Sequence, residues 1–145
     1  MSNNADLAAA LDAMTVNRRA LVAVVEPLTQ DDMAKSRPGS WSVDRVLQHV
    51  IESEVAYVKL LAHLRGLTAP EIAAGTMPQD GPDAVAQLAR TRAALVEMTD
   101  GIDDETLYRL RAVGANEYSA LSVLENDADH DHEHVAQISR LFAGA

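Results

Sequence analysis

The chain of 145 residues has 12 basic and 22 acidic residues, a net charge of −10 and no cysteine. The missing cysteine excludes disulfide scaffolds, cysteine-ligated zinc or iron–sulfur sites and an internal thiol nucleophile. A pI near 4.7 without a basic cluster argues against nucleic-acid binding. Hydrophobic residues make up 48% of the chain but aromatic residues only 3%, which favours helices over sheets.

The same composition bounds the domain organisation and the location. The N-terminal residues lack the basic and apolar regions of a signal peptide, and no apolar run approaches the ~18 residues of a membrane span. The length matches one domain, and neither a repeat nor a linker divides it. We therefore expect one all-α domain over residues 1–145, in the cytoplasm and without a membrane partner.

The first half of the chain predicts two long helices. Apolar residues recur at helical spacing over residues 6–25, and a proline stops this helix. The polar stretch 29–40 follows, with a Pro-Gly turn signal and no expected helix. The second helix begins just after Trp41, with Ser42 at its N-cap, and ends at Gly66.

The second half predicts two more long helices. Residues 66–82 are rich in proline and glycine and allow at most one helical turn, so they form a long connection. A third helix covers residues 82–98, a short helix is expected over 103–110, and residues 114–117 form a loop. The last helix covers residues 119–142. This order predicts a four-helix bundle with a long crossover connection.

Helical phase sorts the five histidines into two groups. His130 and His134 lie four residues apart at the edge of the last helix's apolar face, so both imidazoles point towards the bundle interior. His49 lies at the margin of the second helix's apolar stripe and is expected to meet them. His63 and His132 fall on polar sides and are expected to face solvent.

The three inward histidines predict a metal site. Three neutral imidazoles with a vacant position form the ligand set of catalytic zinc, whereas manganese and magnesium prefer carboxylates. The alternative is a solvated acidic face, since five acids lie within residues 125–133. Asp127 and Asp131 argue against it because they are in phase with the apolar edge, where an unpaired carboxylate is costly. We interpret them as carboxylates that orient the ligand imidazoles and raise the imidazole pKa.

Three further residues have two interpretations each. Trp41 either packs the start of the second helix against the core or lines a pocket. Tyr57 is either a core residue or a catalytic one. Glu54 lies in phase with an apolar stripe, where it either pairs with an arginine of another helix or acts in catalysis.

Two segments resemble one known family. The run WSVDRVLQHV, from Trp41 to Val50, resembles the DinB-like signature in which Trp-Ser opens the second helix and a histidine follows. The run HDHEHVAQI, which begins at His130, resembles the closing His-x-x-x-His-x-x-Gln-Ile motif. Together they extend the resemblance over nearly the whole chain. It implies a four-helix bundle, often dimeric, with a divalent metal on His49, His130 and His134.

The resemblance implies an enzyme that depends on zinc or nickel. Relatives are described as hydrolases, or as S-transferases and isomerases that use mycothiol, bacillithiol or glutathione. An open metal position lowers the pKa of bound water to about 7 or binds a thiol as thiolate. The alternative is a non-catalytic metal-binding or stress-response module. We expect a homodimer with a small-molecule substrate, and the sequence identifies neither that substrate nor a general base.

Overall fold

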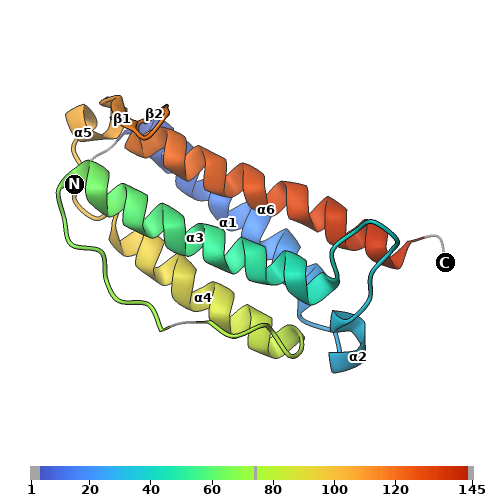
Figure 1. Cartoon of the computed structure of the whole chain (residues 1–145). Coiled ribbons are helices and arrows are strands. Elements are labelled where there is room, and N and C mark those ends of the chain that lie inside the picture. Colours follow the sequence, from blue (N-terminus) through green and yellow to red (C-terminus); the bar gives the residue numbers. More distant parts are fainter. Residues whose placement is uncertain (1–3, 74, 144–145) are drawn as a thin grey trace.

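Four long helices form an elongated bundle in the computed structural model, which describes residues 4–73 and 75–143 (Figure 1). They are α1 (Ala5–Val25), α3 (Val43–Arg65), α4 (Gly81–Glu97) and α6 (Ala120–Phe142). Helices α1 and α6 run in one direction and α3 and α4 in the other. Between them lie α2 (Gln30–Met33), α5 (Asp104–Tyr108), β1 (Arg111–Val113) and β2 (Asn116–Tyr118). The predicted four-helix bundle is confirmed.

The short helix α2 lies in the stretch where no helix is expected. Its signal is a capping box, in which the Thr29 side chain accepts from the Asp32 N–H and the Asp32 carboxylate accepts from the Thr29 N–H. Such a box satisfies N–H groups that a helix start leaves unpaired, and it nucleates even one turn. Ser42 occupies the predicted N-cap of α3, but its hydroxyl donates to Asp44 instead of capping the backbone.

The expected loop over residues 114–117 is the turn of a β-hairpin only at positions 114–115, because residues 116–117 belong to strand β2. Strands β1 and β2 pair antiparallel, with Arg111 opposite Tyr118 and Val113 opposite Asn116. Gly114 opens the turn at φ +63°, a conformation that glycine adopts without strain. Strands of three residues are too short to show an alternating pattern, which is why the sequence gives no strand signal here.

The crossover segment between α3 and α4 contains no helix in its described residues and runs along the bundle (Figure 1). It returns the chain to the opposite end, and α4 therefore runs parallel to α3. At that end the Gly81 N–H donates to the Leu28 carbonyl over 2.8 Å. A Cβ on Gly81 would lie 2.3 Å from the carbonyl oxygen of Val25, so only glycine fits this approach to α1.

The core is aliphatic, and charged side chains divide it into two clusters. One cluster surrounds Met14, Leu61, Leu95 and Leu124, and the other surrounds Leu21, Leu47, Leu88 and Ile138. On every long helix, polar side chains lie at or next to the boundary between the two clusters. We name them the central polar layer: Arg18, Glu54, Thr91, Arg92, Asp127 and Asp131.

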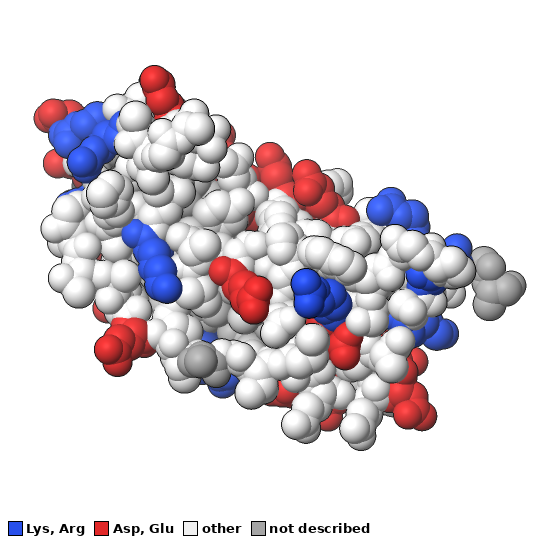
Figure 2. All heavy atoms as spheres, in the orientation of Figure 1, with Lys and Arg blue, Asp and Glu red and all other residues white. Residues whose placement is uncertain are grey.

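No described helix is long and apolar enough to cross a membrane. On the face that Figure 2 shows, acidic and basic side chains are scattered singly or in small groups among uncharged atoms. This face therefore carries no extended basic patch of the kind that binds a nucleic-acid backbone.

Candidate metal centre

Helices α3 and α6 bring three histidines to one point. The Nε2 atom of His130 lies 3.1 Å from Nε2 of His49 and 2.9 Å from Nε2 of His134. One nitrogen from each ring lies within 4.8 Å of the other two. His134 is buried, and the other two rings are half-buried. The convergence predicted from helical phase is confirmed, and so is the exposure of His63 and His132.

Gln137 determines which nitrogen of His134 is free. Its Oε1 atom lies 2.6 Å from Nδ1 of His134, and because a carbonyl oxygen only accepts, Nδ1 carries the hydrogen. Nε2 of the neutral ring then presents its lone pair to the other histidines. Gln137 follows His134 by three residues, so helical spacing places the two side chains together.

This tautomer leaves the cluster short of protons. Because His134 Nε2 is a lone pair, His130 Nε2 must carry the single hydrogen that serves both of its nitrogen contacts. A divalent cation would instead accept a lone pair from all three rings. Zinc–nitrogen bonds of about 2.0–2.1 Å place tetrahedral ligands roughly 3.3 Å apart, close to the observed contacts. The three residues therefore fit a metal ion.

The histidine group has three members among the residues that the structure describes. Within residues 4–73 and 75–143, neither a carboxylate nor a fourth histidine joins it. Two aromatic rings border the imidazoles instead. The ring centroid of Trp41 lies 5.4 Å from that of His49, and the ring centroid of Tyr57 lies 6.4 Å from that of His130. Trp41 is 45% exposed, which favours the interpretation that it lines the site over the one that it packs into the core.

The comparisons with known proteins agree with this architecture. A family model described as the DinB superfamily matches residues 13–138. The chain belongs to the DinB superfamily. No curated protein sequence matches the chain.

Two solved structures resemble the DinB-superfamily bundle described here. One is TT2238, a four-helix bundle protein, with a TM-score of 0.68 and 23% identity over 90% of this chain and 94% of the other. The second is a DinB-like protein from Bacillus cereus ATCC 10987, with a TM-score of 0.72 and 18% identity over 91% of this chain and 87% of the other. At these identities the likeness shows the shared fold.

Burial makes two imidazoles of this DinB-superfamily protein, those of His49 and His130, harder to protonate. It lowers the pKa of His130 to about 4, aided by the neighbouring charges of His134 and His49. Burial likewise lowers the pKa of His49. The nearby acids, Asp131 among them, raise the pKa of His130, but their effect is weaker than that of burial. The expectation that acids make these rings easier to protonate is therefore wrong for His49 and His130.

The central polar layer explains why those acids have a weak effect. Arg18 donates to Glu54 and to Asp131 over 2.8 Å each, and Arg92 donates to Glu54, Asp127 and Asp131 over 3.0–3.2 Å. The prediction that Glu54 pairs with an arginine of another helix is thereby confirmed. Burial alone would raise the pKa of Glu54, but the two arginines outweigh it and lower that pKa.

Asp127 and Asp131 receive their hydrogen bonds from arginines. Among the described residues neither bonds an imidazole, whereas Gln137 does. Two guanidinium groups face three carboxyl groups, so one negative charge is left over unless a carboxyl group holds a proton. Burial and the charge of Glu54 raise the pKa of Asp127 to about 8 against the pull of Arg92. Asp127 is thus the carboxyl group that keeps a proton.

Gln137, Arg18 and Arg92 were missed as contributors to this site. The periodicity of α1 holds a signal for Arg18, which stands four residues after Met14 and three before Leu21 on the buried face. An arginine in that register requires buried acids as partners. Phase with the apolar faces selects Glu54, Asp127 and Asp131 among the acids, but no spacing rule joins each of them to its arginine.

Proposed function

We propose that this protein is a metal-dependent enzyme, either a hydrolase or a transferase that acts with a low-molecular-weight thiol. The observation that carries the proposal is the convergence of His49, His130 and His134 without a further protein ligand in the described residues. Three ligands with an open position are typical of catalytic zinc sites, whereas structural sites close the sphere with a fourth ligand. A bound metal would supply Lewis acidity and lower the pKa of a water molecule or thiol that binds to it.

The chain's own residues prepare the site for that metal. The low pKa of His130 keeps its ring neutral and able to bind at neutral pH. Gln137 holds His134 in the tautomer whose Nε2 is free. Trp41 and Tyr57 flank the imidazoles and would contact the apolar part of a small substrate. The central polar layer braces α3 and α6 against each other through Arg18, which bonds Glu54 on one helix and Asp131 on the other.

Zinc and nickel are the metals we propose. Imidazole is a ligand of intermediate softness that suits both ions, and the absence of a carboxylate from the ligand group disfavours magnesium and manganese. The small-molecule substrate would be processed in the cytoplasm. A homodimer is part of the same proposal, supported by the exposed apolar side chains Val16, Val96 and Leu110. A sedimentation mass of one 15.6 kDa chain at micromolar concentration would contradict the dimer.

Metal analysis of purified variants tests the ligand assignment. We expect the alanine variants of His49, His130 and His134 each to lose bound zinc or nickel, as measured by mass spectrometry of the metal. The alanine variants of His63 and His132, which are exposed, serve as matched controls and keep the metal. Equal metal content in all five variants would refute the site.

An activity screen of the metal-loaded protein tests the enzymatic part. The protein would be assayed with ester and amide substrates, and with electrophiles in the presence of mycothiol, bacillithiol or glutathione. We expect turnover that disappears in the His134→Ala variant. Stoichiometric metal without turnover in any assay would favour the alternative, a non-catalytic metal-binding or stress-response module.

A further inference from the structure

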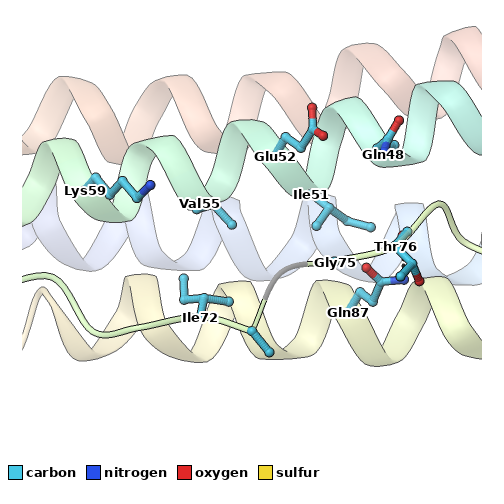
Figure 3. A pocket seen from close by; sticks show the side chains of 10 residues that line it. Gln48, Ile51, Glu52, Val55, Lys59, Ile72, Gly75, Thr76 and Gln87 are labelled. Carbon is cyan, nitrogen blue, oxygen red and sulfur yellow. Dashed lines mark hydrogen bonds between the residues drawn. The ribbon is translucent and has the colours of Figure 1, made fainter.

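A cavity of about 330 Å³ lies between α3, α4 and the crossover segment. Figure 3 shows its walls: Ile51, Glu52 and Val55 on α3, Ile72 on the crossover, Gln87 on α4 and Lys59 at one end. None of the three site histidines lines it. Its volume falls at the lower end of the range for small-molecule sites, about 300–1,000 Å³.

The cavity wall contains an unpaired buried acceptor. The Gln87 side chain is 3% exposed, and its Nε2 donates to the Thr76 carbonyl over 3.1 Å, which fixes the orientation of the amide. Its Oε1 atom is buried and has no hydrogen-bond partner in the described structure. A buried carbonyl oxygen without a donor costs about 1–3 kcal/mol, so buried acceptors are rarely left this way. A ligand with an N–H or O–H group would remove that cost.

Gly75 packs against this oxygen and adds no side chain there. A Cβ atom at position 75 would lie 2.4 Å from Gln87 Oε1 and 3.7 Å from Cγ2 of Ile51. Any other residue would therefore occupy the space in front of the acceptor. The glycine has an ordinary negative or extended φ, so the requirement is one of space and not of backbone conformation.

The opposite end of the cavity carries a positive charge. Lys59 is exposed and forms no ion pair within residues 4–73 and 75–143. It stands eight residues beyond Ile51 on the same helix, which corresponds to roughly 12 Å along the axis. Between the two ends lie the aliphatic side chains of Val55 and Ile72, and Glu52 adds a carboxylate about 10 Å along α3 from Lys59, towards the Gln87 end. The cavity thus presents an acceptor end with Gln87 and Glu52, an apolar middle and an ammonium group in that order.

We propose that this cavity binds a small carboxylic acid whose apolar chain carries an O–H or N–H donor at its far end. The donor bonds Gln87 Oε1, the chain lies between Ile51, Val55 and Ile72, and the carboxylate pairs with the Lys59 ammonium. A chain of about ten ångströms matches the spacing of the two polar ends. The site is separate from the histidine cluster and does not depend on its metal.

Three matched probes test the proposal on the full chain: 8-hydroxyoctanoate, octanoate and 1,8-octanediol. Binding is followed by titration of backbone amide NMR shifts, read at the crossover and along α3. We expect 8-hydroxyoctanoate to shift Ile72 and Thr76 and to bind about tenfold more tightly than octanoate, which lacks the hydroxyl donor. Loss of the carboxylate in 1,8-octanediol should weaken binding as well.

Variants localise the contacts. In Gln87→Leu the advantage of 8-hydroxyoctanoate over octanoate should vanish, and Gly75→Ala should weaken the hydroxy acid selectively. Lys59→Met should remove the advantage over the diol. The His130→Ala variant should bind all three probes as the wild type does. Shifts confined to the histidine region, no crossover shifts at millimolar probe, or equal affinity for octanoate and its hydroxy derivative in the wild type would each overturn the proposal.

Discussion

The Gln137 Oε1 atom lies 2.6 Å from Nδ1 of His134, one helical turn further along α6. This contact assigns the hydrogen of the ring to Nδ1 and directs Nε2 at the histidine cluster. A side chain that binds no metal therefore decides which atom of His134 is able to do so.

Removing this contact should weaken metal binding without unfolding the bundle. We expect Gln137→Leu to lower zinc affinity by about 10–100-fold, because such outer hydrogen bonds orient the imidazole and raise its basicity. Competition with a chromophoric chelator measures the affinity. The Gln137→Glu variant keeps an acceptor oxygen and should therefore retain most of the zinc affinity. An unchanged affinity in Gln137→Leu would show that the tautomer is set elsewhere.

The central polar layer should be a major contributor to stability. Replacing Arg92 by methionine removes the arginine partner of Asp127 and leaves Glu54 and Asp131 with Arg18 alone. Breaking a buried ion network from one side costs about 3–5 kcal/mol of unfolding free energy, since charges stay buried without a partner. Urea unfolding measures this loss. Arg90→Met on the exposed side of α4 is the matched control, expected to change stability by less than about 0.5 kcal/mol.

Asp127 should make the metal-free protein lose stability as the pH rises. Its pKa is raised from 3.8 to about 8 in the folded state, so the folded protein binds this proton more tightly than the unfolded chain does. The stabilisation is complete below pH ~4 and is lost as the pH rises towards 8, with a slope of at most about 1.4 kcal/mol per pH unit.

The Asp127→Asn variant isolates this effect. Its amide mimics the protonated carboxyl group and does not titrate, so the slope should disappear. The difference in unfolding free energy between the variant and the wild type, measured from pH 5 to pH 8, removes contributions common to both proteins. A difference that stays constant with pH would mean that Asp127 is ionised in the folded protein.

Metal binding should persist to lower pH than free imidazole would allow. Protons compete with the metal for each ring, but the pKa of His130 is lowered to about 4 and that of His49 is lowered as well. We expect the thermal stabilisation by added zinc at pH 6 to approach that at pH 8 and to fall away nearer pH 5. Thermal melting with and without zinc gives this profile. If the thermal stabilisation by zinc were already lost at pH 6.5, the imidazoles would be protonated as readily as those of exposed histidines.

Helical phase was enough to predict the long helices and the three metal-site histidines. The apolar repeat of α3 and α6 is a local property, and it places His49, His130 and His134 on inward faces whatever the rest of the chain does. The same phase gave the exposed positions of His63 and His132. The short helix expected over residues 103–110 is α5, whereas α2 and the two strands were missed, because four residues of α2 or three of β1 hold too little periodicity to register.

Only the tertiary structure decided the partners of the inward polar side chains. Sequence placed Asp127 and Asp131 on a buried edge and required partners for them, but Arg18 stands 113 residues before Asp131 and no spacing rule joins them. Likewise the path of the crossover segment places Gly75 beside the Gln87 side chain, whose Oε1 atom has no hydrogen-bond partner in the described residues. Periodicity tells which side of one helix faces inward, whereas the identity of the group it meets depends on the packing of distant segments.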